Sequence, residues 1–181
     1  MTTRRPPNSP AAHAEVAWRE NHDLFLAELK TGRVWQEWAA AELTIRGLRV
    51  ELPEFEFRKH VRDADHFTAT DCDLTIRGSA VGDCVLEVKS RDIHFIDAPG
   101  YPYPTAMIDT VAGWEAKRVE PRAVLLVSRT ARRMLVASAA TKPAWKVARK
   151  RDAVRGIWDD FYECPREYLR SMDWLVKKLR P

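Results

Sequence analysis

The chain has 181 residues, of which 45% are hydrophobic and 31% charged, and its formal net charge is +4 at neutral pH. This composition is typical of one globular domain with its own core, and no apolar run approaches the roughly 18 residues of a membrane-spanning helix. The N-terminus lacks the apolar core of a secretory signal, and three widely spaced cysteines argue against a disulfide framework or a zinc site. We therefore expect a cytoplasmic protein with a flexible Pro-rich tail at residues 1–12 and a single domain at 13–181.

The first part of the chain predicts two helices and a strand. Apolar residues favour a helix over about Ala14–Lys30, which Gly32 would end as a C-cap, and a second helix over about Arg33–Ile45. The apolar stripe expected on the second helix consists of Val34, Trp38, Ala41 and Ile45. A strand follows at about Leu48–Arg58, where Pro53 favours an edge position or a bulge.

A hairpin is predicted next, with strands at Asp71–Arg77 and Asp83–Arg91 and glycines at the turn between them. Side chains alternate along a strand, so Glu87 and Lys89 lie on the same face. If the strands pair, Asp73 points towards the same place. Two carboxylates and one ammonium group together would suit a hard divalent cation and a positioned water molecule.

The second half of the chain predicts further strands between helices. Prolines at 99, 102 and 104 favour a stiff extended loop, after which Thr105 would cap a helix that runs to about Lys117. The remaining expected elements are a central strand at Arg122–Arg129, a strand at Met134–Ala139, a basic stretch interpreted as helical at Trp145–Arg155, a short strand at Trp158–Cys164 and a helix at Arg166–Leu179. This order predicts an α/β fold with a central mixed β-sheet flanked by helices.

Basic residues are concentrated between Arg129 and Arg155, where nine of them face a single acidic residue, Asp152. A solvated helix face would explain this segment, and so would a surface that follows the phosphates of a nucleic acid. The residues expected to contact phosphates are Arg129, Arg132, Arg133, Lys146, Arg149, Lys150 and Arg151.

The hairpin residues resemble the PD-(D/E)XK nuclease superfamily. Asp73 is followed by an apolar strand, and Glu87-Val88-Lys89 follows after a gap of thirteen residues. As a pattern of elements the resemblance extends over roughly Val34–Ser138, with Cys72 where the superfamily pattern has proline. It implies a restriction-endonuclease-like core with N-terminal helices and a C-terminal helix.

The resemblance also implies a function, namely hydrolysis of phosphodiester bonds in DNA by a Mg2+- or Mn2+-dependent nuclease. Asp73, Glu87 and the backbone carbonyl of Val88 would bind the metal, and Lys89 would assist the attacking water. The superfamily often takes a further carboxylate from a helix before the sheet, for which Glu37 is the candidate and Glu42 its competitor. A helix after the sheet often adds a Lys or Gln, and Lys117 is the candidate.

Two alternatives to a nuclease stay open. The chain could be a non-catalytic nucleic-acid-binding or assembly protein on the same fold, or its carboxylates could form ordinary cross-strand ion pairs with Arg77 and Arg91. DNA is the expected partner, in a homo-oligomer or a larger nucleoprotein complex if the domain does not act alone. The sequence does not distinguish duplex, branched and single-stranded substrates.

Overall fold

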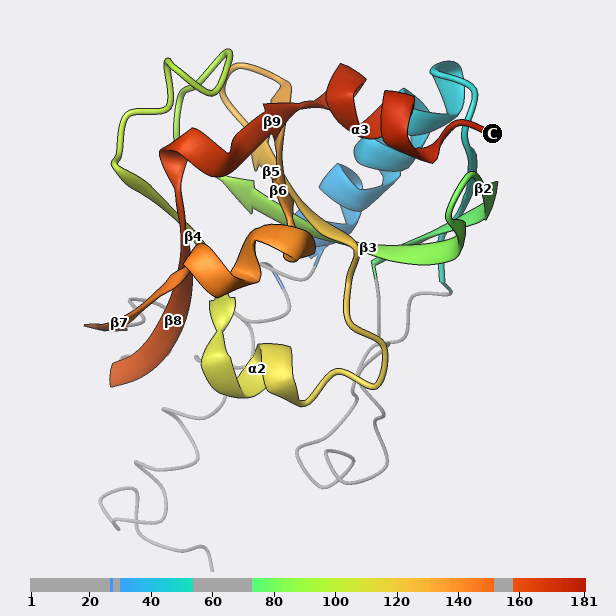
Figure 1. The fold of residues 1–181 in the computed structure, drawn as a ribbon. Helices are drawn as coiled ribbons and strands as arrows, with labels where there is room; N and C mark the ends of the chain where they lie inside the picture. Colours follow the sequence, from blue (N-terminus) through green and yellow to red (C-terminus); the bar gives the residue numbers. More distant parts are fainter. Residues whose placement is uncertain (1–26, 28–29, 54–72, 152–157) are drawn as a thin grey trace, which may run out of the picture.

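The computed structural model in Figure 1 describes residues 27, 30–53, 73–151 and 158–181. Within these residues the centre of the molecule is a six-stranded β-sheet. In order across the sheet the strands are β1 (Arg49–Glu51), β2 (Leu74–Ser79), β3 (Gly82–Arg91), β5 (Ala123–Ser128), β6 (Arg133–Ser138) and β9 (Leu169–Ser171). β3 and β5 are parallel, whereas the other neighbouring strands of this sheet are antiparallel.

A smaller antiparallel sheet contains β4 (Thr105–Thr110), β8 (Trp158–Pro165) and β7 (Lys146–Arg151), in that order. Helix α2 (Val111–Glu115) follows β4 directly, and helix α3 (Met172–Leu179) follows β9. A further helix, called here the N-terminal helix, covers residues 30–45. The predicted α/β class, with a central mixed sheet flanked by helices, is confirmed.

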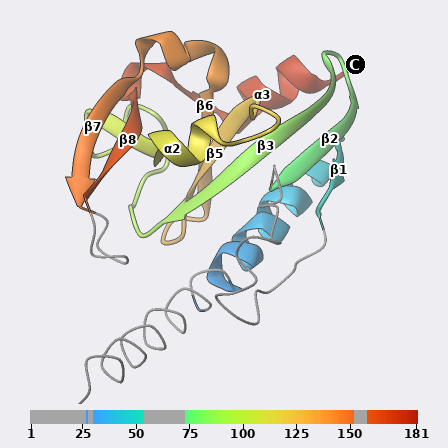
Figure 2. The same ribbon diagram turned by 90° about the horizontal axis from the view of Figure 1, so that it is seen from below.

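The central sheet is covered on both faces, which explains why β5 is apolar throughout and fully buried. Leu125 packs on one face with residues of the N-terminal helix and α3. Leu126 packs on the other face with the residues of β4 and α2, including Ile108 and Trp114. Figure 2 shows the N-terminal helix and α2 on opposite sides of β3. The strand that carries Glu87 and Lys89 therefore runs between two packed layers.

The N-terminal helix differs from the expected one in two respects. It is continuous through Gly32, so the predicted C-cap there is wrong. Its buried face is built by Ala39, Ala40 and Leu43, whereas Val34 and Ile45 from the expected stripe are 60% and 80% exposed. The small side chains of Ala39 and Ala40 let the helix pack close to the sheet. The spacing of larger apolar residues does not identify alanines as the buried face. The predicted end at Ile45 is correct. The earlier helix expected before Lys30 lies largely outside the described residues, as do the tail at 1–12 and the segment 54–72.

The segment 105–117 is not the single helix that we expected. Thr105–Thr110 is strand β4, and only Val111–Glu115 is helical. Ala106 and Ile108 are buried and alternate with less buried neighbours, so the strand period of two prevails where β4 pairs with β8. Thr110, rather than Thr105, caps the short helix, since its hydroxyl accepts a 2.9 Å hydrogen bond from the Gly113 amide.

Two segments near the C-terminus also differ from expectation. The basic stretch interpreted as a helix forms strand β7, which pairs with β8 from Lys146 to Arg151. The segment expected as one long helix begins with a short 3-10 helix (Arg166–Tyr168) and β9, and only Met172–Leu179 is α-helical. The Ser171 side chain caps α3 by accepting a hydrogen bond from the Trp174 amide. Along the described parts of the chain, no helix has the length and apolar character that a membrane span requires.

Candidate active site

The site begins where β2 stops pairing with β3. The first paired residues are Leu74 and Leu86, so the part of β3 beyond them has no β2 neighbour. Asp73, directly before β2, bridges this end. Its amide donates to the Leu86 carbonyl at 3.2 Å, and its side-chain Oδ2 accepts from the Val88 amide at 2.7 Å. Because Val88 lies between Glu87 and Lys89, the hydrogen bond fixes Asp73 against the Glu-Val-Lys segment.

Two acidic and two basic side chains form a compact network on the α2 side of β3. The Lys89 Nζ lies 2.8 Å from the Glu87 Oε1 and 3.2 Å from the Asp109 Oδ2. The Lys117 Nζ lies 3.1 Å from the Glu87 Oε2 and 3.6 Å from the same Asp109 oxygen. Each lysine therefore bridges both carboxylates. Asp109 is on β4 and Lys117 follows the C-cap residue of α2, Ala116, so the smaller sheet and its helix complete the site.

The N-terminal helix contributes Gln36 to the site instead of the expected Glu37. The Gln36 Nε2 donates a 2.7 Å hydrogen bond to the Asp73 Oδ1. The Glu37 side chain is 56% exposed and pairs with Arg33 at 3.0 Å, one helical turn earlier. Its competitor, Glu42, pairs with Arg46. The buried face of the helix lies about two positions from the expected stripe, and Glu37 borders the expected stripe rather than the face that packs on the sheet.

Burial and crowding change the protonation behaviour of Asp73. Loss of hydration and the nearby Glu87 carboxylate raise the pKa of Asp73 from 3.8 to about 7, against the opposing effects of the Val88 hydrogen bond and the two lysines. Burial alone would lower the pKa of Lys89, but Glu87 and Asp109 outweigh burial and raise it. Lys89 is therefore a stable cation, whereas Asp73 changes charge near neutral pH.

The oxygen donors of this site suit a divalent cation. Asp73 and Glu87 carry the hard carboxylate ligands that Mg2+ prefers, and their mutual repulsion, seen in the raised Asp73 pKa, would be relieved by a cation. In the described structure both Glu87 oxygens are engaged by lysines. No group of three or more His, Cys, Asp or Glu side chains in the described residues is arranged to hold a metal. A metal at Glu87 would therefore have to replace a lysine contact.

One alternative has the Asp73 and Glu87 carboxylates paired with cross-strand arginines, and the Arg77 side chain does not form such a pair. This residue contacts Glu51 and Asp83, each at 2.8 Å. Lysines from β3 and from the end of α2 pair with Glu87 instead.

The basic residues expected to contact phosphates are divided between two places. Arg129 pairs with Asp92 at the end of β3, while Arg132 and Arg133 are exposed at the turn between β5 and β6. The others lie on β7, where they alternate between the two faces of a strand instead of sharing one helix face. These exposed β7 residues are Lys146, Arg149, Lys150 and Arg151. Lys150 also pairs with the buried Glu163.

Comparison of the chain with protein-family models, with curated proteins and with solved structures gives no match. The resemblance to the PD-(D/E)XK nucleases thus depends on the hairpin residues and on the geometry described above.

Proposed function

We propose that the chain is a metal-dependent nuclease that hydrolyses phosphodiester bonds in DNA, as a member of the PD-(D/E)XK superfamily. The observation that carries this proposal is the 2.7 Å hydrogen bond from the Val88 amide to the Asp73 carboxylate. It holds the isolated carboxylate of the motif against its Glu-Val-Lys segment, from which it is separated by thirteen residues of sequence.

Asp73 and Glu87, with the backbone carbonyl of Val88, are the groups that would hold Mg2+ or Mn2+. When bound, such an ion would polarise the scissile phosphate and lower the pKa of a coordinated water. Gln36 fixes the orientation of the Asp73 carboxylate through its 2.7 Å hydrogen bond. The site is thereby ordered before a substrate arrives, which is what efficient catalysis requires.

Lys89 and Lys117 supply positive charge on the same side of β3. Both ammonium groups lie within 3.6 Å of Asp109, which holds them beside Glu87. In the transition state of phosphodiester hydrolysis, negative charge grows on the phosphate oxygens, and ammonium groups fixed nearby stabilise it. We assign this role to Lys89, with Lys117 as a second cation and Asp109 as the residue that positions both.

A cleavage assay tests the proposal directly. Linear, circular, branched and single-stranded DNA are incubated with the protein in Mg2+, in Mn2+ and in EDTA. We expect products from at least one DNA form in either metal and none in EDTA. Intact DNA of all four forms in both metals, from protein shown to be folded, would contradict the proposal.

DNA contact is proposed for the ribbon formed by β7 and β8. Arg149 and Arg151 lie on one face of β7. In the register of the two strands, Arg151 lies opposite Trp158 of β8, whose side chain is 62% exposed. A two-stranded ribbon fits a DNA groove, and arginines on it can reach phosphates. We also propose that DNA is the partner of the chain and that the protein is located in the cytoplasm.

Reversing the charge of Arg149 and Arg151 to Glu is expected to weaken DNA binding and to flatten its salt dependence. Each lost phosphate contact on duplex DNA reduces the slope of log K against log salt by about 0.9, so we expect a change of roughly 1.8. Fluorescence anisotropy over a salt series measures this slope. Reversal of Lys177 and Lys178, exposed on α3, makes the same change in charge and serves as the control. Equal slopes for the two variants would exclude the ribbon as the contact surface.

A second candidate function is a non-catalytic nucleic-acid-binding or assembly protein. It is favoured by the pairing of both Glu87 oxygens with lysines, because the buried charges already balance without a metal. Thermal unfolding with and without Mn2+ distinguishes the candidates. A metal-dependent rise in Tm that Asp73→Asn removes supports the nuclease, and an unchanged Tm supports the second candidate.

A further inference from the structure

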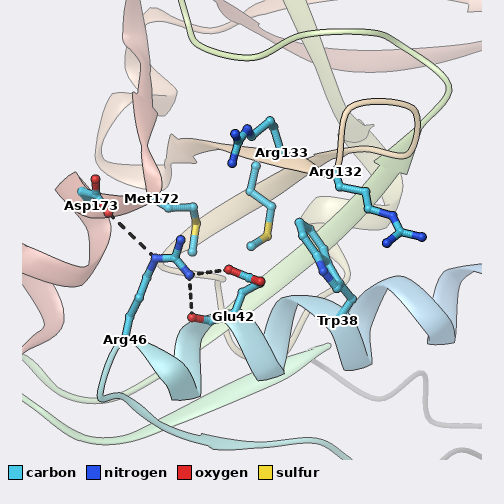
Figure 3. A pocket seen from close by; sticks show the side chains of 8 residues that line it. Trp38, Glu42, Arg46, Arg132, Arg133, Met172 and Asp173 are labelled. Carbon is cyan, nitrogen blue, oxygen red and sulfur yellow. Dashed lines mark hydrogen bonds and ion pairs between the residues drawn. The ribbon is translucent and has the colours of Figure 1, made fainter.

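A separate pocket of about 170 Å3 lies between the N-terminal helix, the β5–β6 turn and the start of α3. Figure 3 shows the side chains that line it. Trp38 and Glu42 come from the helix and Arg46 directly follows it. Arg132, Arg133 and Met134 come from the turn and β6, and Met172 and Asp173 come from α3. None of these residues belongs to the Asp73–Glu87 site, so a ligand of this pocket would bind separately from that site.

The charges around this pocket do not balance. Arg46 contacts both acidic side chains of the lining, Glu42 at 2.5 Å and Asp173 at 3.8 Å (Figure 3). Arg132 and Arg133, across from the helix, are exposed, and neither has an acidic partner in the described part of the chain. The lining thus carries three guanidinium groups and two carboxylates. These two exposed side chains, which extend in different directions from the turn in Figure 3, are left available to an anion from outside.

The backbone at Arg132 adds an independent observation. Arg132 has φ = 49° and is the one non-glycine residue with positive φ in the described chain. This left-handed conformation is favoured for glycine and asparagine and costs other residues free energy. Its amide donates to the Ser128 carbonyl at 2.9 Å, so the turn itself needs no arginine side chain. An arginine at a position suited to glycine indicates a role for its guanidinium group.

The lining and the volume of the pocket limit the size of the anion that it can bind. Met134 and Met172 are buried and Trp38 is half-buried, so these three side chains form an apolar part of the lining. The volume is below the roughly 300 Å3 at which pockets for drug-sized ligands begin. A pocket of this size takes a small group rather than a whole large ligand. Arginine forms paired hydrogen bonds with phosphate oxygens.

We propose that this pocket binds a phosphate monoester group, with Arg132 and Arg133 as its cationic contacts. Such a group carries nearly two negative charges at neutral pH, which matches the two arginines without acidic partners. The group comes from the end of a nucleic-acid strand or from a small phosphorylated molecule, which have this chemistry in common. The inference does not depend on the proposed cleavage activity, because the pocket shares no residue with the carboxylate site.

Isothermal titration calorimetry with phenyl phosphate tests the pocket on the full chain. We expect a dissociation constant on the order of 1 mM or below, because two charge-assisted contacts form when the exposed arginine side chains turn towards the same phosphate group. Arg132→Gly should weaken binding about tenfold or more. The variant should fold at least as stably as the wild type, since glycine suits the left-handed position. Arg133→Gln should weaken binding similarly, and Lys178→Gln, at an exposed position of α3 that does not line the pocket, should leave it unchanged.

Two comparisons complete the test. Phosphate binding that survives in the Asp73→Asn variant places the ligand away from the carboxylate site and supports the proposal, whatever that variant does to cleavage. Two oligonucleotides that differ only in a 5′-phosphate identify the source: a gain in affinity that Arg132→Gly removes assigns the group to a strand end, and no gain assigns it to a small molecule. The proposal is overturned if phenyl phosphate does not bind, or if it binds the Arg132→Gly variant as tightly as the wild type.

Discussion

Replacing Asp73 by asparagine is expected to lower metal-dependent DNA cleavage by at least about a thousandfold. Asparagine keeps the shape of the side chain, and its carbonyl can still accept the Val88 amide, while Gln36 can turn its own amide to match. The negative charge needed to hold a metal is lost. Initial rates of cleavage in Mg2+ and Mn2+, on the DNA form that the wild type cleaves fastest, measure the effect.

Glu37→Gln is the matched control for this experiment. It removes one carboxylate from the same helix that contributes Gln36, but from a side chain that is 56% exposed and paired with Arg33. Its cleavage rate should equal that of the wild type. Glu87→Ala is a poorer probe, because it would leave Lys89 and Lys117 with Asp109 as the one carboxylate that they share, and this excess of buried positive charge would destabilise the fold. Wild-type rates in a folded Asp73→Asn protein would remove Asp73 from the mechanism.

The second large effect concerns stability as a function of pH. The pKa of Asp73 is about 7 in the folded protein and about 3.9 in an unfolded chain, so the folded state binds the proton more tightly. Between these values the folded state holds more protons than the unfolded state, and the free energy of unfolding falls as pH rises. From pH 5 to pH 8 this loss is at most about 3 kcal/mol, at 1.36 kcal/mol per pKa unit. Asp73→Asn should not show it.

Urea unfolding in EDTA at pH 5 and pH 8 measures this difference between the two proteins. Asp83→Asn provides the control. The Gly78 amide and Arg77 lower the pKa of Asp83, so this carboxylate is ionised in the folded and the unfolded state at both pH values, and the wild type and this variant should change in parallel between pH 5 and pH 8. If the wild type and Asp73→Asn change in parallel between pH 5 and pH 8, burial and the Glu87 charge do not raise the pKa of Asp73 into this range.

Local sequence patterns were sufficient to predict the hairpin and the central strand. Alternation places Glu87 and Lys89 on one face, and an uninterrupted apolar segment identifies β5 as buried on both faces. Both features depend only on neighbouring residues. The convergence of Asp73 with the Glu-Val-Lys segment could be expected for the same reason, since a short hairpin fixes which residues lie opposite each other.

Asp109 was missed because the strand that carries it was interpreted as part of a helix. Ala106 and Ile108 alternate with Thr105, Met107 and Asp109, which places Asp109 on the less buried face, but Met107 breaks the polar side of this alternation in the sequence. The pairing of β4 with β8 decided the outcome, and β8 lies far away in sequence. Gln36 was missed through the rotation of the helix. Its buried face depends on close packing of Ala39 and Ala40 against the sheet, which periodicity alone does not determine.

The pairing of β4 with β8 also constrains when the site can assemble. Thr105 pairs with Pro165, 60 positions later, and such long-range contacts form slowly because a long loop must close first. During synthesis, which adds roughly 5–20 residues per second, β4 has no strand partner until β8 has left the ribosome. Asp109 on β4 then lacks the sheet that holds it beside Lys89 and Lys117. A nascent chain therefore carries the Asp-Glu-Lys hairpin for several seconds before the charges around it are in place, so the network of Glu87, Lys89, Asp109 and Lys117 is complete only after β8 has paired with β4.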